Sequence, residues 1–347
     1  MQKIFFNLVF SLITYFIYVY PFDILTYLLT NKEIIKISSL FVTLFFSVII
    51  FFYFKSKNNF FLLRLFVYEG MGIGFISFWV SSVGLAINHF SSASSYKIGI
   101  GCFFSIAIVT IFSLINARGV IVRKLNFNSL KLIKPVKIIF FSDVHLGSNS
   151  LAHLEKILTK IKNLQADFII IGGDLIDSSS FKLDNLSVLN NLGKPIYFIS
   201  GNHEYYVKNH KQKLSDLGKF KVNFLDNKSF TLKGINIIGI SDNQEDINQI
   251  KIAKKKFKRS LFNLLVIHKP TIWNLIHENF DLMLSGHTHN GQIFPFNYIV
   301  KYKFKYTYGI YKKFNSLLYV SSGAGCWGPK MRLGSQNEVI HISINKK

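Results

Sequence analysis

The sequence has few cysteines, prolines and acidic residues, and each shortage excludes a class of protein. Two cysteines, Cys102 and Cys326, are too few for a disulfide scaffold or a zinc site made only of thiolates. Six prolines and 22 glycines without a fixed spacing exclude collagen-like and proline-rich architectures. Charged residues make up only 17% of the chain and hydrophobic residues 50%, which excludes intrinsic disorder. The remaining classes are a membrane protein, a basic globular protein, and a chain that joins the two end to end.

The scarcity of acidic residues leaves a formal net charge of +23, and this charge is unevenly distributed. Residues 1–116 contain seven Lys or Arg and three Asp or Glu, whereas residues 117–347 contain 34 and 15. The first region therefore has a net charge of +4 and the second a net charge of +19. We predict an all-α transmembrane anchor over residues 1–116, followed by a basic domain over residues 117–347.

The first region contains four long apolar stretches, approximately residues 4–29, 35–54, 66–89 and 98–116. Each is close to or above the roughly 20 residues that a helix needs to cross the hydrocarbon core of a bilayer. Buried helices of a soluble domain are the alternative, but four such runs within 116 residues disfavour it. A cleaved signal peptide is disfavoured for the first run, which is too long and lacks a small-residue cleavage site.

The basic residues that flank these stretches predict the orientation of the chain. They are concentrated in the second connector and after the fourth stretch: Lys55, Lys57, Arg64, Arg118, Arg123 and Lys124. Because cytoplasmic loops carry an excess of Lys and Arg, these residues are expected on the cytoplasmic side. We expect a multi-pass protein of the inner (cytoplasmic) membrane whose carboxy-terminal domain faces the cytoplasm.

The second region contains short, almost continuous apolar runs that are typical of strands buried on both faces. They cover residues 136–141, 167–171, 196–199, 235–240, 264–267, 281–284 and 317–320. Helix-like segments lie between the early runs, at 151–165 and 186–193. This alternation predicts an α/β fold in which sheets are covered by helices.

Polar motifs follow five of these runs directly. They are Asp143-Val-His145, Gly-Asp174-Leu-Ile-Asp177, Gly-Asn202-His203-Glu204, His268, and Gly-His287-Thr-His289. Because ligands of α/β sheets bind at the carboxyl ends of strands, we expect these side chains to share one crevice. A single Asp or His at such a position is usually structural, but five successive strand ends of this kind indicate a site.

Mixed Asp, Asn and His ligation without thiolate suits Mn²⁺, Fe²⁺ or Zn²⁺. The motifs offer more ligands than one four-coordinate ion requires, which indicates two divalent ions. Paired ions are a recurrent device for hydrolysing phosphate esters, because they bind phosphate oxygens and activate a water.

These motifs and their order resemble those of the calcineurin-like metallophosphoesterases. The apolar amino-terminal region and the segments GHTHNGQIFP (286–295) and SSGAGCWGPKMRLG (321–334) narrow the resemblance to the membrane-attached bacterial branch. The resemblance implies a two-sheet β-sandwich flanked by helices and a hydrolase that acts on phosphate ester bonds. Asn290 stands where a second glycine is common in this branch.

The resemblance also implies a role for each motif residue. The first metal would be held by Asp143, His145, Asp174 and His289. The second would be held by Asp174 as a bridge, Asn202, His268 and His287. His203 would be catalytic, either donating a proton to the leaving oxygen or stabilising the phosphate. Asp177 and Glu204 would orient the histidine ligands or His203.

Two further features allow alternatives. Arg332 either binds the substrate phosphate, if its loop closes over the metals, or belongs to a tail that latches the core. The basic run Lys254–Arg259 either meets anionic lipid or substrate, or is a solvated helix face.

A catalytic domain tethered at a bilayer gains effective concentration only toward membrane-borne substrates. We therefore expect a lipid-linked phosphate substrate, with UDP-2,3-diacylglucosamine as a candidate, and contact with inner-membrane lipids. The alternative is a metal-dependent nuclease or a cyclic or nucleic-acid phosphodiesterase. The charge of +19 favours it, but the membrane anchor disfavours nucleic acid as a partner. A non-enzymatic membrane scaffold is the second alternative, and it would have no need of His203.

Overall fold

The computed structural model describes residues 2–34, 36–55 and 60–347, and it divides into two compact units. The helical unit comprises Met1–Ile115 and Gly328–Met331, and the sheet unit comprises Asn116–Trp327 and Arg332–Lys347. Lys57, on which the predicted orientation partly depends, lies outside the described residues.

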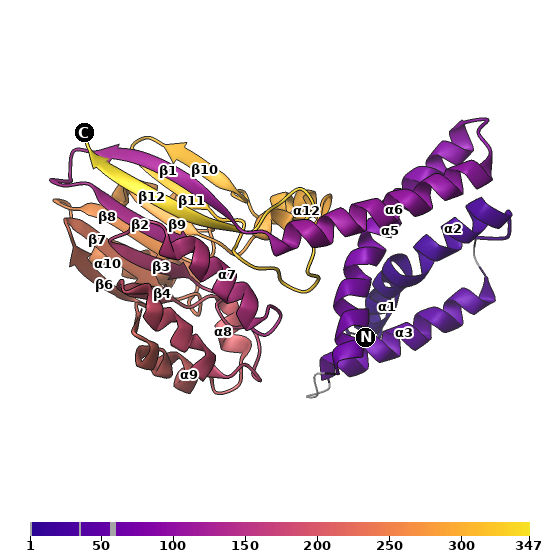
Figure 1. Ribbon diagram of the computed structural model, residues 1–347, viewed down its shortest axis with the longest axis horizontal. Helices are drawn as coiled ribbons and strands as arrows, with labels where there is room; N and C mark the ends of the chain where they lie inside the picture. The colour runs from indigo at the N-terminus through magenta and orange to yellow at the C-terminus, as the bar shows by residue number, and fades with distance from the viewer. Residues whose placement is uncertain (1, 35, 56–59) are drawn as a thin grey trace. The chain divides into compact units, whose positions relative to one another are not determined.

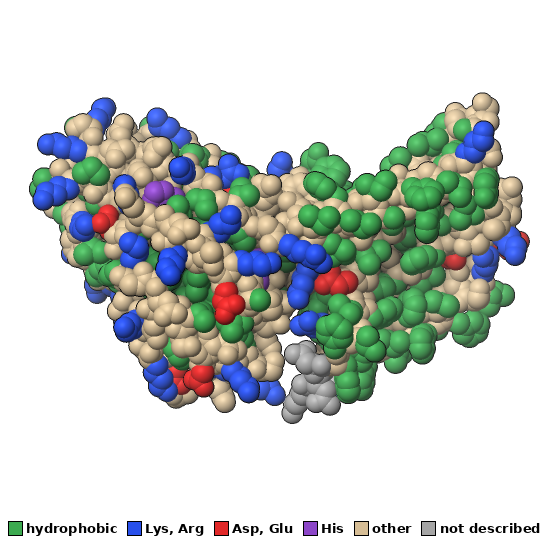
Figure 2. Space-filling model, viewed as in Figure 1, with side chains coloured by type: hydrophobic (Ala, Val, Ile, Leu, Met, Phe, Trp, Pro, Cys, Tyr) green, Lys and Arg blue, Asp and Glu red, His purple; other side chains and the backbone are tan. Residues whose placement is uncertain are grey.

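The helical unit consists of helices joined by short connections (Figure 1). Its elements are α1 (Gln2–Thr14), the π-helical turn η1 (Tyr15–Val19), α2 (Tyr20–Thr30), α3 (Ile37–Lys55), α4 (Phe61–Arg64), the π-helical turn η2 (Leu65–Glu69), α5 (Gly70–Phe90) and α6 (Ser95–Arg118). Within the described residues, four continuous helical stretches are long and apolar enough to cross a membrane: Phe5–Thr30, Ile37–Lys55, Phe61–Phe90 and Ser95–Arg118. Apolar side chains cover most of the face of this unit that Figure 2 shows.

Close backbone approach holds the helical unit together. A Cβ atom at Gly74 would lie 2.0 Å from the carbonyl oxygen of Ile17, so glycine allows α5 to pack directly on η1. The segment Gly328–Met331 belongs to this unit as well, and the backbone N–H of Lys330 donates to the Glu69 carboxylate at 3.1 Å.

The sheet unit contains two six-stranded mixed sheets. In spatial order, the first sheet is β1 (Ile121–Ser129), β12 (Glu338–Lys346), β2 (Val136–Phe141), β3 (Phe168–Gly172), β4 (Ile196–Ile199) and β5 (Val222–Phe224). The second is β10 (Gly309–Lys313), β11 (Ser316–Val320), β9 (Leu282–Ser285), β8 (Phe262–Ile267), β7 (Ile235–Ile240) and β6 (Lys228–Leu232).

The two sheets pack face to face, and helices cover their outer faces. Alternate residues of β2 divide between two cores, because successive side chains of a strand point to opposite faces. Ile138 and Phe140 join the core between the sheets, whereas Ile139 and Phe141 pack with α7 (Leu151–Lys162). This arrangement explains the continuous apolar runs and confirms the predicted two-sheet sandwich flanked by helices.

Short helices and turns complete the sheet unit. They are η3 (Leu183–Leu192), α8 (Asn202–Tyr206), α9 (His210–Asp216), η4 (Leu217–Phe220), α10 (Asp246–Lys256), α11 (Trp273–Ile276), η5 (His277–Asn279), η6 (His289–Gly291) and α12 (Phe296–Lys303). The basic run Lys254–Arg259 begins in the last turn of α10, where positive charge interacts favourably with the helix dipole.

Strand direction brings the polar motifs to one edge of each sheet. Strands β2, β3 and β4 are parallel to one another in the first sheet, and β7, β8 and β9 are parallel in the second. The five motifs follow β2, β3, β4, β8 and β9, so each begins at the carboxyl end of a parallel strand.

Candidate metal centre

The residues that follow these strands adopt an unusual backbone conformation. Asp143, His145, Asp174, His287 and His289 all have positive φ angles, between 49° and 73°. This left-handed region is costly for residues other than glycine, and such strain concentrates at functional sites. Strands β2, β3 and β9 are therefore each followed by a sharp turn instead of continuing as a ladder.

The first group of candidate ligands contains Asp143, His145 and His289, whose donor atoms all lie within 4.8 Å of one another. The Nε2 atoms of His145 and His289 face each other at 3.0 Å. The Nε2 atom of His289 lies 3.6 Å from Asp143 Oδ1, and that of His145 lies 3.8 Å from Asp174 Oδ2. One ion can be bound by donors that converge in this way.

The second group contains Asp174, His268 and His287, again with donor atoms within 4.8 Å. His268 Nε2 lies 3.1 Å from Asp174 Oδ2 and 3.9 Å from Asp143 Oδ1. Asp174 also groups with His145 and His203, so its carboxylate lies between the two sets of ligands. This is the position that a bridging ligand would need.

Asn202 provides an independent test of whether the residues fit metal ions. Its Oδ1 atom is buried and accepts no hydrogen bond from any residue that the structure describes. An unpaired buried amide oxygen is costly, and a cation would satisfy it. The donor set of carboxylates, imidazoles and one amide oxygen therefore fits divalent ions, and the family resemblance implied Asn202 as a ligand of the second of them.

Hydrogen bonds to the far side of two histidines set their orientation. His268 Nδ1 donates to the carbonyl oxygen of Gly172 at 2.9 Å, which leaves Nε2 directed at Asp174. His145 Nδ1 lies 3.5 Å from Asp177 Oδ2, the place expected for an orienting carboxylate. Burial opposes a charge on His268, but Asp174 and Asp143 outweigh it and raise the pKa of this imidazole to about 10.

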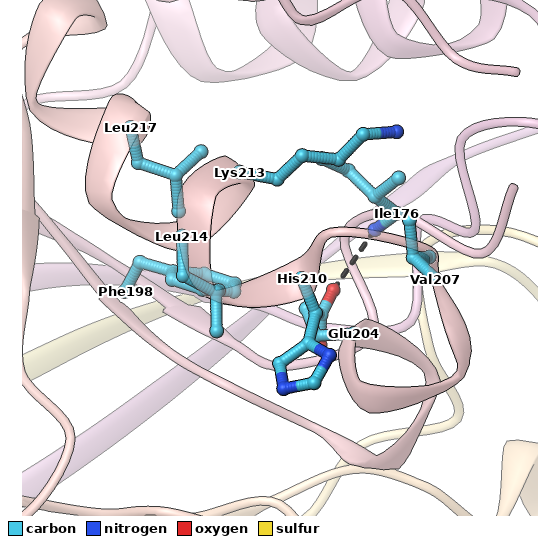
Figure 3. Close-up of a pocket in the computed structure, with 8 residues that line it drawn as sticks. All are labelled: Ile176, Phe198, Glu204, Val207, His210, Lys213, Leu214 and Leu217. Carbon is cyan, nitrogen blue, oxygen red and sulfur yellow. Dashed lines mark hydrogen bonds between the residues drawn. The ribbon is translucent and has the colours of Figure 1, made fainter. Parts of the chain in front are cut away.

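Glu204 hydrogen-bonds to backbone N–H groups around the candidate ligands. Its two oxygens accept the N–H groups of Asp174, Ile176 and Gly201 at 2.8 to 2.9 Å. Figure 3 shows the bond to Ile176 beside a small, largely apolar pocket. Burial and the charge of Asp174 raise the pKa of Glu204 to about 7. Glu204 therefore ties the turn after β3 to the turn after β4.

His203 lies at the edge of the centre, with its Nε2 atom 4.0 Å from Asp174 Oδ2. Burial lowers its pKa to about 4, so the ring is neutral at neutral pH in the absence of a ligand. The rings of Tyr206 and Trp327 lie 5.3 Å and 5.7 Å from it, and both side chains are largely exposed. These two flanking aromatics were not predicted as site residues.

Arg332 is fully buried, which contradicts a direct contact with substrate. Its guanidinium donates to the carbonyl oxygens of His289, Ser322 and Gly325 and lies 3.2 Å from His289 Nδ1. Because these bonds use its donors inside the protein, Arg332 supports the loop that carries His289. The alternative of a tail that latches the core agrees with this position.

Close approach of the strand-end turns depends on glycine. A Cβ at Gly286 would lie 2.3 Å from Asp143 Oδ2, and one at Gly201 would lie 2.2 Å from Asp174 Oδ1. Ser142, which sequence reasoning missed, donates to Asp143 Oδ2 at 2.5 Å. A serine beside an aspartate carries no distinctive sequence signal.

Comparison with known proteins agrees with this geometry. Residues 136–291 match the family model described as calcineurin-like phosphoesterase. An uncharacterised metallophosphoesterase of Helicobacter pylori is 37% identical over 229 residues, which cover 62% of each chain. The chain thus spans about three fifths of the length of this relative.

Two other relatives extend the comparison. The protein YpbG of Bacillus subtilis is 33% identical over 60% of this chain and 81% of its own length. A bovine transmembrane protein with a metallophosphoesterase domain is 28% identical over 61% of this chain and 53% of its own length. The chain belongs to the calcineurin-like phosphoesterase family.

Proposed function

We propose that this protein is a membrane-anchored, metal-dependent hydrolase of phosphate ester or pyrophosphate bonds. The observation that supports this most is the pair of ligand groups that share Asp174, together with the unsatisfied amide oxygen of Asn202. A structural site would need only one closed set of ligands, whereas two adjoining sets suit phosphoryl chemistry.

The first ion would be held by Asp143, His145, Asp174 and His289, and the second by Asp174, Asn202, His268 and His287. Mn²⁺, Fe²⁺ or Zn²⁺ bound there would neutralise phosphate charge and make a bound water more acidic. Asp177 would keep His145 oriented toward the first ion.

His203 would donate a proton to the leaving oxygen. Its low pKa without ligand is compatible with this role, because a bound phosphate places negative charge beside the ring and raises that pKa. Its position 4.0 Å from Asp174, with 15% of the side chain exposed, leaves it open to a substrate that occupies the centre.

The substrate proposed is lipid-linked, with UDP-2,3-diacylglucosamine as the candidate. Four helices able to cross a membrane support this class, because a bilayer-bound enzyme meets bilayer-bound substrates at high effective concentration. The positive charges near Lys55, Arg64 and Arg118 support an inner-membrane location with the sheet unit in the cytoplasm.

One comparison of substrates tests the proposal. The full chain, purified in detergent and loaded with Mn²⁺, would be assayed on an aryl phosphodiester, an aryl phosphomonoester, UDP-2,3-diacylglucosamine and single-stranded DNA. We expect hydrolysis of aryl esters and the fastest turnover on the lipid-linked pyrophosphate. Preference for DNA with a steep salt dependence would support the nuclease instead.

Two variants complete the test. Asp174→Asn should lose both metal binding and hydrolysis, whereas His203→Asn should bind metal normally and hydrolyse the aryl esters slowly. Full activity of His203→Asn would refute its assigned role. No hydrolysis of any substrate by the metal-loaded protein would favour the membrane scaffold.

A further inference from the structure

Helix α12 carries an apolar surface immediately after the loop that contains His287 and His289. Each residue of α12 is at least partly exposed. Tyr298, Ile299 and Tyr302 are 61%, 57% and 96% exposed, and their spacing places them on one side of the helix. Phe294, just before α12, and Phe296, at its start, are also exposed, and the ring of Phe294 contacts that of Tyr298. We call Phe294, Phe296, Tyr298, Ile299 and Tyr302 the aromatic patch.

Lysines lie within α12 and just after it, close to the aromatic patch in sequence. The ammonium groups of Lys301, Lys303 and Lys305 lie 5.7 to 5.8 Å from the ring centres of nearby aromatic residues. The sequence has no Asp or Glu between Asp281 and Glu338, and this interval contains six lysines. The surface is therefore both apolar and positively charged, with no acidic residue near it in sequence.

Both ends of α12 contact the loop that contains His287 and His289. At the first end, Gly291 approaches α12 so closely that a Cβ there would lie 2.3 Å from Asn297 Cα. Beyond the other end, the ring of Phe304 lies 5.2 Å from that of His287. Helix α12 therefore packs against the loop that carries His287 and His289. A molecule bound to the aromatic patch would lie close to these candidate ligands.

We propose that the aromatic patch enters the interface of an anionic lipid bilayer and presents the headgroup of a bilayer-bound substrate to the metal centre. Aromatic residues favour the membrane–water interface, and lysines beside them are attracted to anionic headgroups. Because the chain carries helices able to cross a membrane, a bilayer is the occupant that we infer for this surface. This inference rests on the proposed membrane attachment and phosphoesterase activity, and it adds a specific surface.

The first experiment detects insertion without relying on activity. The full-length Tyr302→Cys variant would be labelled with an environment-sensitive fluorophore and reconstituted in vesicles with roughly one third anionic phosphatidylglycerol in phosphatidylcholine. Cys102 and Cys326 are buried and should react little with the fluorophore. Labelling of the unsubstituted chain measures this background.

Ile133→Cys is the matched control. Ile133 is an apolar residue that is 85% exposed, and it precedes β2, at the opposite end of that strand from Asp143. We expect the label at position 302 to shift to the blue and to be quenched by lipids with brominated acyl chains. The label at position 133 should instead be quenched by iodide in the water.

Equal quenching of both labels by iodide would overturn the inference. A blue shift at position 302 that persists in detergent and depends on protein concentration would show that a second copy covers the patch, which also overturns it.

A second experiment connects the patch to turnover. Replacing Lys301, Lys303 and Lys305 together with Gln should lower hydrolysis of a lipid-linked pyrophosphate in anionic vesicles by about tenfold. Hydrolysis of a soluble aryl phosphate ester should stay unchanged, because these lysines do not touch the metal centre. Equal loss on both substrates, or no loss on either, would contradict the inference. If the unsubstituted protein hydrolysed neither substrate, the proposed function would be refuted. Insertion of the aromatic patch would still be tested, because the labelling experiment does not depend on hydrolysis.

Discussion

Substitution of Arg332 by Met separates a structural role from the predicted contact with substrate. Arg332 is fully buried and donates to carbonyl oxygens of His289, Ser322 and Gly325. Met fills a similar volume but donates no hydrogen bond, so Arg332→Met leaves these three acceptors without their partner.

The expected loss of stability follows from these contacts. An unsatisfied buried acceptor costs about 1–3 kcal/mol, and a hydrogen bond to a charged donor is at the upper end of that range. Allowing for partial relaxation, we expect the free energy of unfolding to fall by about 3–5 kcal/mol. In a domain of this size about 1 kcal/mol corresponds to 2–4 °C, so Tm should fall by about 10 °C.

Thermal unfolding of the full chain in detergent, followed by tryptophan fluorescence, measures this change. Arg332→Lys should be intermediate, because a lysine ammonium cannot reproduce the planar set of donors. Affinity for Mn²⁺ should also weaken in Arg332→Met, since the loop that carries His289 loses its support. An unchanged Tm with a raised KM would show that Arg332 binds substrate, and would refute the structural role.

Three further predictions concern the centre itself. Gly286→Ala would place a Cβ 2.3 Å from Asp143 Oδ2, so Mn²⁺ affinity measured by calorimetry should fall at least about tenfold. Gly218→Ala, whose Cβ would have no neighbour within 4 Å, is the control, and equal effects of the two substitutions would contradict this reasoning. Glu204→Gln removes one of two oxygens that serve three backbone N–H groups, and should cost about 2–3 kcal/mol in urea unfolding. An unchanged midpoint would show that its charge is not needed. When the metal ion is present at a hundredfold excess over its Kd, its removal should lower the free energy of unfolding of the native protein by about 3 kcal/mol. Asp174→Asn should show no such change, and the same loss in that variant would place the ion elsewhere.

Local spacing explains why the centre was predictable from sequence. Each motif lies within a few residues of an apolar run, and parallel strands bring their carboxyl ends together whatever the loops between them contain. The buried strands were likewise visible as continuous apolar runs, because both faces of β2, β3 and β8 are covered.

Features that depend on distant partners were not predictable in this way. Strand β1 has the sequence IVRKLNFNS, which contains no long apolar run, and it pairs with β12 more than 200 residues later. Arg332 shows the same difficulty, since its partner His289 lies 43 residues away and only the folded chain reveals that the guanidinium is buried. Glu204 is a third case, since its hydrogen bonds to the backbone N–H groups of Asp174 and Ile176 are visible only in the folded chain.

The backbone strain of the centre indicates how it is held in place. Five residues with left-handed φ angles, Asp143, His145, Asp174, His287 and His289, each cost at least about 1 kcal/mol. Together that is about 5 kcal/mol, which is comparable to the whole net stability of an ordinary domain. The two buried sheets from which these turns extend, and the hydrogen bonds of Glu204 to the turns after β3 and β4, offset this strain. Because the strands and these bonds fix the turns, the fold of the sheet unit itself positions the candidate ligands, and Gly201 and Gly286 allow the turns to approach one another closely.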